Sequence, residues 1–529
     1  MTKEYNLGGA SKPKPDNSLR VGNKQYKRVH QRSLRAILRN ELQRAEKFLN
    51  QYLLDHPNDQ ETHFMLGILH GQKGDIAQAE DSLAQAIKLG LPEDRIVAGP
   101  RKMFEPLSES KLVKEVFQKY QNRLVHGPLL GNVTNNSASV WVRTAQESTV
   151  IVIVYDANGD EISRGKSKTK ASDDFTAVVK VDGLRALQKY DYKVFIDGQQ
   201  CEVASKTSFR TFPEPGTASK FSIAFGGGAG YVPQNERMWG TIGGQNPDAI
   251  LLLGDNVYID DPESKIMQQY TYHRRQSRPQ WRFLTAGVPV FTIWDDHDFS
   301  TDDSWGGADV AIPFWKKDIV FPVFRQNWAN PSYGGGEEQP GCWYKFQIGD
   351  VDFFMLDCRY YRTDPGQPSP SMLGPVQTKW LKKQLLESSG TFKVVCSSVP
   401  WDYRTKGGSL DTWNGYKQER EEIFAFIEAN KIEGIILMSA DRHRSDAWKI
   451  SRSDGYDFFE FNSSRLTNQH VHPTMENKGA IFSYNKLQSF GIVTFDTTAN
   501  DPSATYEVVN IDGEKPHSIN VKRSELKSR

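Results

Sequence analysis

Three apolar, strand-like runs in this chain end in clusters of Asp and His. The first run ends at Asp255, the second at the Asp-Asp-His-Asp sequence of residues 295–298, and the third at Asp441 and His443. Loops at the carboxyl ends of buried strands build ligand sites in α/β folds, and carboxylates at the rim of a core are costly unless a cation balances them. Because hard and borderline metal ions prefer oxygen and imidazole donors, the pattern predicts a metal-dependent hydrolase.

The run at residues 295–298 is the most specific of the three. Three acids and a His in four residues repel one another unless cations neutralise them. A helix N-cap followed by an acidic first turn would explain part of this run. It would explain neither the His nor the density of charge. The other two motifs are weaker alone, because Gly254-Asp255 could simply start a turn and Asp441 with His443 could be a salt-bridged surface turn.

The composition limits the kind of protein that this chain can be. At 529 residues it exceeds one ordinary hydrophobic core, so two or three domains are expected. The 66 Lys and Arg residues nearly balance 65 Asp and Glu residues, which argues against nucleic acid or an anionic membrane as the main partner. No run approaches the length of a membrane-spanning helix. The four cysteines include no Cys-x-x-Cys pair and are interpreted as ordinary thiols.

Both ends of the chain are polar. Residues 1–24 are rich in Gly, Pro, Lys and Asn, which predicts a flexible N-terminus, and residues 511–529 are expected to form a polar tail. The first 24 residues lack the apolar core of a signal peptide, so a cytoplasmic location is expected. Export is the alternative if a signal peptide has been removed.

A helical pattern with an internal repeat occupies residues 25–121. Apolar and small residues recur 34 positions apart, and Leu66-Gly67 lies between the two copies. The repeated positions are Ala45, Leu49 and Leu53, followed by Ala79, Leu83 and Ile87. This period resembles the tetratricopeptide repeat, although about two units are fewer than such arrays need to stand alone. Two interpretations follow, a helical hairpin packed on the rest of the protein, which we favour, and a partner-binding groove.

The remainder of the chain divides by its periodicity. Residues 122–213 alternate with period two between turn signals, which predicts a small antiparallel β-sandwich. A Pro- and Gly-containing stretch, residues 213–219, is a linker by composition. From residue 220 to 510, strands alternate with helical segments, which predicts a mixed α/β domain.

Several other residues are assigned structural places. His470 and His472 lie in a polar loop and are expected at the surface, as is His273. Cys358 lacks a Cys-x5-Arg loop and is expected to be a packed thiol. The aromatic residues between 281 and 344 are expected in the core or in a lid.

Together, the motifs resemble the alkaline phosphatase D (PhoD-like) family of metallophosphatases. The resemblance runs in the correct order from residue 124 to 510, and its first part, residues 126–143, is similar to the domain that precedes the catalytic one in that family. The matching motifs are Gly254-Asp255-x-x-Tyr258, Trp294-Asp295-Asp296-His297-Asp298, Leu356-Asp357-x-Arg359-x-x-Arg362, Trp413-x-x-Tyr416-x-x-Glu419-Arg420 and Asp441-Arg442-His443.

The resemblance implies a calcineurin-like α/β core, in which two sheets flanked by helices carry a site for two or more metal ions that hydrolyses phosphate mono- or diesters. It assigns Asp255 as a bridge between two cations, Tyr258 as a ligand of the first, Asp296 and His443 as ligands of the second, and Asp441 as completing the first. Such a pair of cations lowers the pKa of a water and neutralises phosphoryl charge. The implied metal ligands are Asp255, Tyr258, Asp295, Asp296, Asp441 and His443, and the implied catalytic residues are His297, Asp296, Arg359 and Arg442.

The candidate roles of the non-ligand residues differ in kind. His297 could protonate the leaving group or hold a phosphoryl oxygen. Arg359 and Arg442 offer planar charged donors for phosphate oxygens. Either arginine could instead pair with a neighbouring acid, Asp357 or Asp441, and for Arg359 the two interpretations weigh equally.

One departure from the family bears on the metal. The family places a Cys ligand just after the first core strand, whereas residues 221–230 here contain no Cys, Asp or His. Loss of a thiolate weakens the case for ferric iron and favours Ca, Mn or Mg, although Tyr258 still suits iron. The loss leaves an alternative function open, a catalytically weakened family member that acts mainly as a partner-binding protein through its helical repeat.

Overall fold

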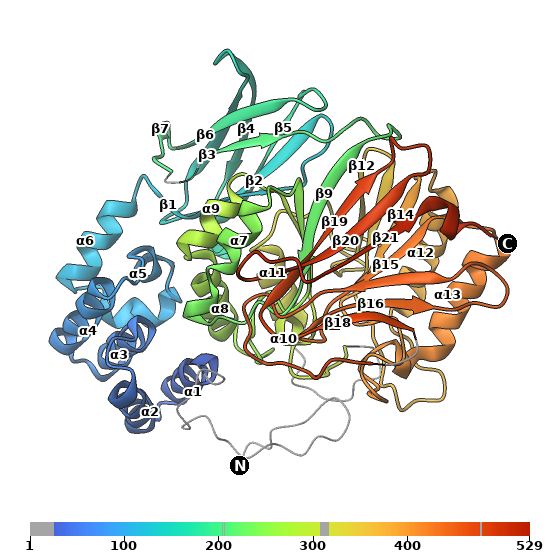
Figure 1. Cartoon of the computed structure of the whole chain (residues 1–529). Coiled ribbons are helices and arrows are strands. Elements are labelled where there is room, and N and C mark those ends of the chain that lie inside the picture. Colours follow the sequence, from blue (N-terminus) through green and yellow to red (C-terminus); the bar gives the residue numbers. More distant parts are fainter. Residues whose placement is uncertain (1–25, 204, 206, 307–316, 477–478, 529) are drawn as a thin grey trace.

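The computed structural model places three parts one after another along the chain (Figure 1). It describes residues 26–203, 205, 207–306, 317–476 and 479–528. The expected flexible N-terminus, residues 1–24, lies outside this part of the chain, as do Phe314 and Trp315 of the aromatic-rich stretch. Trp281 and Trp328 from the same stretch are buried, as expected for core residues.

Helices form the first part. They are α1 (Tyr26–Leu38), α2 (Leu42–Asp55), α3 (Gln60–Lys73), α4 (Ile76–Lys88), α5 (Asp94–Ala98), the 3₁₀ helix η2 (Arg101–Leu107) and α6 (Lys111–Tyr120). Asp59 and Asp75 cap α3 and α4 by accepting hydrogen bonds from the backbone of Thr62 and Gln78. Gly67 lets α3 approach α4 closely, because a Cβ there would lie 2.6 Å from Leu83. The tetratricopeptide assignment stays a prediction.

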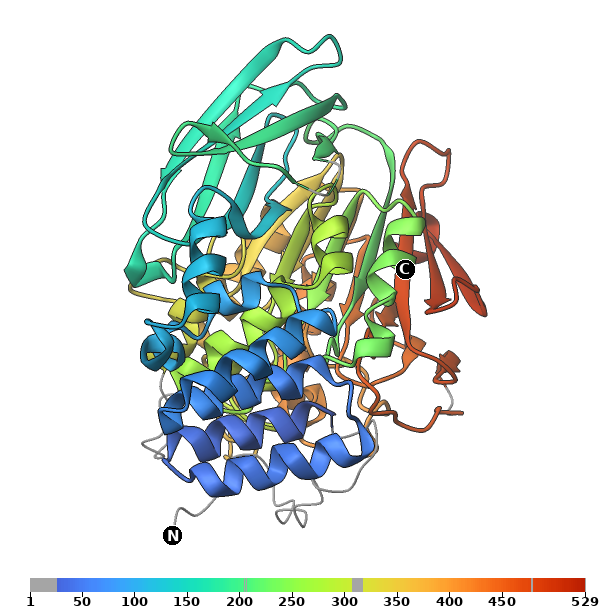
Figure 2. The same cartoon turned by 90° about the vertical axis from the view of Figure 1, so that its left-hand side faces the viewer.

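The helical segment packs against the α/β body. Figure 2 shows its helices side by side, in front of α8 (Lys265–Gln276) and α9 (Pro279–Thr285) of that body. Buried Glu61 of α3 accepts hydrogen bonds from Arg95 of α5 at 2.8 Å and from Tyr270 of α8 at 2.7 Å. Arg282 of α9 reaches Asp94 at 2.7 Å. These contacts fit the packed hairpin that we favoured.

The β-rich second part contains the two groups of antiparallel strands expected for a small sandwich, and one of these groups continues into the largest sheet of the protein. Its elements are β1 (Leu124–Gly131), β2 (Ser137–Thr144), β3 (Thr149–Tyr155), β4 (Glu161–Lys168), η3 (Ala171–Asp173), β5 (Thr176–Asp182), β6 (Lys189–Ile196), β7 (Gln199–Gln200) and β8 (Ser208–Arg210). Strands β3, β4, β6, β7 and β8 make their own sheet, but β1, β2 and β5 join the largest sheet of the protein. The junction is a parallel pairing of β1 with β11 (Val290–Ile293), at Gly131 and Val290.

A buried polar contact also joins this part to α8. His273 of α8 lies 2.7 Å from Asp174, which Arg143 of β2 contacts at 2.8 Å. His273 is fully buried, so the surface position expected for it is wrong. The polar sequence around His273 reflects buried hydrogen bonds and ion pairs rather than exposure to water.

Two large sheets form the core of the third part. The nine-stranded sheet has the order β21-β20-β19-β9-β10-β11-β1-β2-β5, and the seven-stranded sheet has the order β12-β13-β14-β15-β17-β16-β18. The strands of this part are β9 (Lys220–Gly226), β10 (Ala249–Leu253), β11 (Val290–Ile293), β12 (Tyr344–Ile348), β13 (Val351–Met355), β14 (Phe392–Cys396), β15 (Ile435–Ser439), β16 (Ser445–Ile450), β17 (Phe458–Asn462), β18 (Ala480–Tyr484), β19 (Ser489–Asp496), β20 (Ser503–Asn510) and β21 (His517–Lys522).

Aromatic side chains hold the two sheets face to face. Phe291 of β11 stacks on Phe346 of β12 with ring centroids 3.9 Å apart, and Phe221 of β9 contacts Phe353 of β13 at 6.4 Å. Helices cover the outer faces (Figure 1). The helical elements of this part are η4 (Pro233–Asn235), α7 (Met238–Gly244), α8 (Lys265–Gln276), α9 (Pro279–Thr285), α10 (Asp296–Phe299), α11 (Lys317–Arg325), α12 (Gly374–Glu387), η5 (Trp413–Tyr416), α13 (Lys417–Ala429) and η6 (Arg523–Leu526).

The C-terminal residues are more ordered than expected. Residues 511–529 were expected to form a polar tail, but β21 within them pairs antiparallel with β20, for example Val521 with Ala504. Val521 is buried while its polar neighbours on the strand are largely exposed. One buried side chain and a ladder of backbone hydrogen bonds therefore hold an otherwise polar edge strand.

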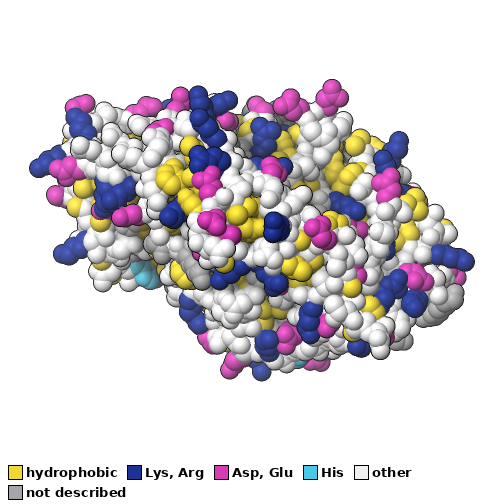
Figure 3. Space-filling model, turned by 90° about the horizontal axis from the view of Figure 1, so that it is seen from above, with side chains coloured by type: hydrophobic (Ala, Val, Ile, Leu, Met, Phe, Trp, Pro, Cys, Tyr) yellow, Lys and Arg dark blue, Asp and Glu magenta, His cyan; other side chains and the backbone are white. Residues whose placement is uncertain are grey.

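The surface carries charges of both signs. From above, Lys and Arg side chains alternate with Asp and Glu across the visible face, without a large area of one sign (Figure 3). This agrees with the near balance of charge in the sequence. Within the described residues, none of the helices has the length and apolar character needed to span a bilayer.

Candidate metal centre

The candidate site is built at the carboxyl ends of neighbouring strands. Strands β10 and β11 run parallel with Leu253 beside Ile293, so the loops that follow them leave the sheet together. Gly254 adopts φ +97°, and a Cβ there would lie 2.5 Å from the Cβ of Asp295. A glycine is therefore needed for the two loops to approach each other.

Asp298 fastens these two loops together. Its carboxylate accepts hydrogen bonds from the backbone N–H groups of Asn256 at 3.2 Å, Val257 at 3.1 Å and Asp295 at 3.0 Å. Burial raises the pKa of Asp298 to about 7, although these three donors oppose the shift. The sequence places Asp298 in the most specific of the three motifs, but the pattern alone does not distinguish this organising role from metal binding.

Three side chains meet closely at the strand ends, and we call Asp255, Asp296 and His297 the acidic group. Their donor atoms lie within 4.8 Å of one another, and all three residues are buried. Asp255 Oδ2 accepts a hydrogen bond from Tyr258 at 2.8 Å, while Asp255 Oδ1 has no hydrogen-bond partner within the described part of the chain. Such a buried carboxylate oxygen is costly alone and fits a cation.

The electrostatics of Asp255 agree with a need for positive charge. Burial raises its pKa well above the usual range, His297 lowers it, and the carboxylates of Asp296 and Asp295 raise it further. The ionised form is therefore disfavoured by the protein alone. A bound cation would reverse this balance.

A second donor group adjoins the first and was not anticipated. Asp296, Asp302 and Asp303 also bring ligand atoms within 4.8 Å of one another. The backbone N–H of Asp303 donates to Asp296 at 2.7 Å, which holds the loop against the acidic group. The only sequence signal was an acidic pair shortly after residues 295–298.

His297 is held from one side. Its Nδ1 lies 2.5 Å from Asp260, a residue that sequence analysis missed, and its Nε2 lies 3.8 Å from Asp302. Burial would lower the pKa of His297, but Asp260, Asp296 and Asp255 together raise it well above its usual range. The ring of Tyr258 packs 4.3 Å from the imidazole ring, which limits its rotation further.

The loop after β15 approaches from the second sheet. Asp441 and His443 adopt left-handed backbone angles, with φ of +66° and +49°. The Asp441 carboxylate lies 3.5 Å from both Lys406 and Arg442, so it already has cationic partners. Neither Asp441 nor His443 joins a tight donor group within the described residues.

Two further histidines lie beside His443. The ring centroid of His443 is 4.9 Å from that of His470 and 5.5 Å from that of His472. The Nε2 atoms of His470 and His472 are 3.2 Å apart. His470 is exposed and His472 half-buried, in agreement with the expected surface loop. Their proximity to His443 could not be predicted, because no sequence pattern links the two loops.

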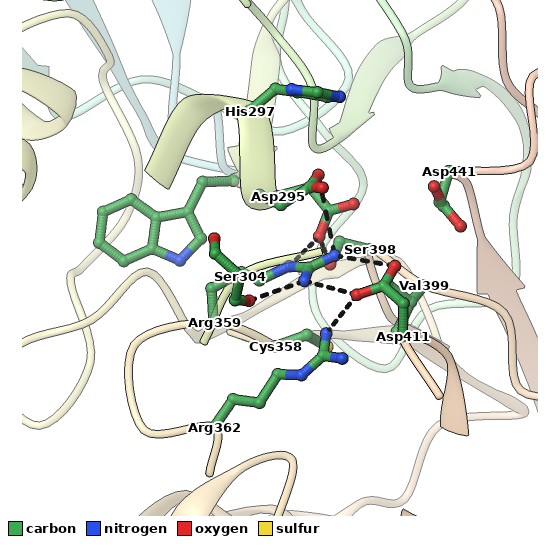
Figure 4. A network of polar contacts seen from close by, with 12 residues as sticks. Asp295, His297, Ser304, Cys358, Arg359, Arg362, Ser398, Val399, Asp411 and Asp441 are labelled. Atoms are coloured by element: carbon green, nitrogen blue, oxygen red, sulfur yellow. Dashed lines mark hydrogen bonds and ion pairs between the residues drawn. The ribbon is translucent and has the colours of Figure 1, made fainter. Parts of the chain in front are cut away.

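Arg359 lies at the centre of a buried set of ion pairs (Figure 4). We call this set the arginine network; its members are Asp295, Arg359, Arg362, Lys406 and Asp411. Arg359 contacts Asp295 at 2.5 Å and Asp411 at 2.8 Å, and donates to the carbonyl of Ser304 at 2.9 Å. Arg359 is thus paired with acids, although with neither Asp357 nor Asp441, the partners considered from the sequence.

The arginine network also takes up Asp295. Asp295 Oδ1 accepts from Arg359 and, at 2.7 Å, from Ser398, which leaves Oδ2 without a partner among the described residues. Cys358 contacts Ser397 at 3.3 Å and is fully buried, in line with the packed thiol expected for it. Of the implied ligands, the structure therefore brings Asp255 and Asp296 together with Tyr258 alongside, whereas Asp295 is held by an arginine.

Comparison with known proteins places the chain. A family model described as PhoD-like phosphatase matches residues 223–506, more than half of the chain, and a domain of unknown function (DUF7800) matches residues 121–214. Both matches begin after the last helix of the helical segment, α6, has ended at Tyr120. The chain is similar to alkaline phosphatase D of Bacillus subtilis (strain 168), with 22% identity over 383 residues that span 60% of this chain and 64% of that relative.

Solved structures show the same fold. The structure of PhoD covers 76% of this chain and 91% of its own, with a TM-score of 0.64 and 18% identity. The purple acid phosphatase PPD1 from yellow lupin (Lupinus luteus) seeds covers 75% of both chains, with a TM-score of 0.55 and 14% identity. The α/β metallophosphatase fold and the resemblance inferred from the motifs are confirmed, and the chain belongs to the PhoD-like phosphatase family.

Proposed function

We propose that this chain hydrolyses phosphate esters with the help of cations held at the acidic group. One observation carries the proposal: donor atoms of Asp255, Asp296 and His297 lie within 4.8 Å of one another in a buried site, where Asp255 Oδ1 has no partner among the described residues. Family membership supports the same chemistry. The chain spans 64% of the length of its curated relative, alkaline phosphatase D of Bacillus subtilis.

The donor set favours hard cations. Carboxylate oxygens dominate both donor groups, and Tyr258 lies against Asp255. Ca, Mn and Mg suit such oxygen ligands, and the phenol also suits Fe. Asp296 belongs to both donor groups, so it is better placed to bridge two ions than Asp255, to which the resemblance assigned that role.

The side chains of the acidic group would divide the work. Bound there, cations would activate a water and neutralise charge on the phosphoryl group. Because Asp260 holds Nδ1 of His297, Nε2 is the nitrogen that would hold a proton at the leaving oxygen or contact a phosphoryl oxygen. Tyr258 and Asp260 would keep the imidazole oriented.

Arg442 is a better candidate than Arg359 for contacting substrate phosphate. Arg359 is fully engaged in the arginine network. Arg442 contacts Asp441 at 3.5 Å, and its Nε has no hydrogen-bond partner within the described residues. Its guanidinium therefore keeps donor capacity for phosphate oxygens.

A substrate panel with metal analysis tests the proposal. The purified chain should release product from chromogenic phosphomonoesters or phosphodiesters, lose this activity with a chelator, and regain it with one of Ca, Mn, Mg or Fe. The ratio of monoester to diester turnover would identify the substrate class.

One outcome would instead favour the weakened family member considered from the sequence. If the metal-replete chain bound cations at the acidic group but turned over neither class of ester, the site would be a binding site without catalysis. Absence of both metal binding and turnover would contradict the proposal entirely.

A further inference from the structure

We propose that the N-terminal helical segment is a positioning element for the metal centre, which acts through direct contacts with the loops after β9 and β10. This inference rests on the proposed hydrolytic function. The helices of this segment end at residue 120, before the matched β-rich region (121–214) and the matched phosphatase region (223–506) begin. Neither match therefore assigns the helical segment a role.

Helix α1 binds four consecutive residues of the loop after β10. The Gln31 side chain donates to the carbonyl oxygens of Tyr258 and Ile259, the latter at 3.2 Å. The Arg35 guanidinium donates to the carbonyl of Asp260 at 2.7 Å and to the Asp261 carboxylate at 3.0 Å. Side chains one turn apart on one helix thus fix the loop backbone from residue 258 to 261.

This loop carries two of the residues that shape the acidic group. Tyr258 donates its hydroxyl hydrogen to Asp255 at 2.8 Å, and Asp260 holds His297 at 2.5 Å. Arg35 therefore acts on the site through the Asp260 backbone, without touching the acidic group itself. A displacement of the loop would move the supports of both Asp255 and His297.

The loop after β9 is held by the same helices. Val29 of α1 and Tyr52 of α2 form a small buried apolar cluster with Tyr231, which follows the glycine-rich turn after β9. The Tyr231 hydroxyl accepts a hydrogen bond from Arg278 at 2.7 Å. The helical segment thus reaches both loops that leave the neighbouring strands β9 and β10.

Buried charge makes the docking of the helices specific. Buried Glu61 of α3 lies 4.0 Å from Arg278 of the body and accepts from Tyr270 of α8 at 2.7 Å, and buried Asp94 of α5 pairs with Arg282 of α9 at 2.7 Å. A buried ion pair tolerates little displacement, because separation leaves charge without a partner in the interior. The helical segment is therefore held in one orientation relative to the loop that it supports.

The chain offers a matched control for testing this role. Arg101, in the same helical segment, donates to the carbonyl oxygens of Ala145 at 2.6 Å and Thr144 at 3.1 Å. Like Arg35, it joins the helices to another part of the protein by two guanidinium hydrogen bonds, but its target is the β-rich part. Arg35→Ala and Arg101→Ala in the full chain thus separate loop support from general docking.

Arg35→Ala should lower kcat by about 10- to 100-fold with a small change in KM, because small misplacements at a reacting site have effects of this size. Arg101→Ala should leave kcat within about twofold of the wild type at a similar loss of Tm. Arg35→Lys should restore part of the lost rate. In a His297→Ala background, Arg35→Ala should cost less than in the wild type, because part of its effect passes through His297.

Amide hydrogen exchange gives a readout that does not need turnover. Exchange at residues 258–261 should rise in Arg35→Ala and not in Arg101→Ala. Unchanged exchange there, or equal kcat losses in both variants, would overturn the inference. A wild-type chain inactive on every ester would contradict the proposed hydrolysis alone, since the exchange experiment would still decide whether α1 holds the loop.

Discussion

Two groups of buried charge adjoin each other at residues 295 and 296, and they differ in how their charge is balanced. The arginine network surrounds its two carboxylates with two guanidinium groups and one ammonium group. The acidic group has two carboxylates and one imidazole that is itself held by Asp260, and Arg359 of the network approaches only its Asp296, at 3.8 Å. Buried carboxylates need neighbouring positive charge. The network therefore supplies its own cations, whereas the acidic group depends on cations from solution.

Asp255→Asn should break the acidic group most severely. We expect loss of bound metal and a fall in rate of about 10³-fold or more, because Lewis-acid stabilisation of phosphoryl charge contributes several kcal/mol. Metal content and kcat measure the effect. Asp248→Asn is the matched control at the other end of β10, where the carboxylate accepts from Ser222 at 2.9 Å, and it should keep both. Normal metal content in Asp255→Asn would remove Asp255 from the site.

His297→Ala should separate proton transfer from metal binding within the acidic group. We expect kcat to fall by about 10²–10⁴-fold with near-normal metal content, and by less for esters with good leaving groups, which need no proton. His517→Ala, at a ring stacked on Phe482 far along the chain, is the control. Equal losses for activated and unactivated esters would assign His297 to metal binding or phosphate positioning instead.

Arg359→Met should destabilise the fold by disrupting the arginine network, rather than remove a catalytic group. Removal of the guanidinium leaves Asp295 and Asp411 without their shared partner, which should lower the free energy of unfolding by about 3–5 kcal/mol. Chemical denaturation measures this loss. Arg164→Met removes an exposed pair with Glu161 and should leave the free energy of unfolding nearly unchanged. If Arg359→Met were as stable as the wild type but failed to bind phosphate, Arg359 would belong to the substrate site.

An added cation should stabilise the folded chain by binding at the acidic group and not at the arginine network. At a concentration 100 times the Kd, a cation that binds the folded chain alone should raise the free energy of unfolding by about 2.7 kcal/mol. Thermal unfolding of the metal-free chain, with and without Ca, Mn or Mg, measures this increment. Asp255→Asn should lose it. An equal increment in Asp255→Asn would place the cation elsewhere.

The same contrast explains what could be predicted from the sequence. The acidic group follows apolar strands directly, so local pattern and the positions of strand ends were sufficient to find Asp255, Asp296 and His297. The distant members of the arginine network could not be found in this way. Asp411 and Lys406 lie in a polar loop far along the chain, and a polar loop residue looks the same whether it is exposed or buried in an ion pair.

The fold could be predicted from the sequence to a similar extent as the candidate site. Periodicity predicted helices, then short strands, then a mixed α/β domain, because each depends on neighbours within a few residues. The pairing of Gly131 with Val290 joins distant segments, and no local pattern encodes it. The edge strand β21 was missed because the alternation of Ile519 and Val521 with polar residues is short and lies within an otherwise polar stretch.

The junction of β1 with β11 has a consequence for synthesis of the chain. During translation, β1, β2 and β5 emerge before β9, β10 and β11, so the β-rich part is complete in sequence while one edge of β1 still lacks its neighbour. An unpaired strand edge invites association with other chains. A fragment that ends before residue 220 is therefore expected to aggregate, and the nascent chain must protect this edge until the first strands of the phosphatase domain leave the ribosome.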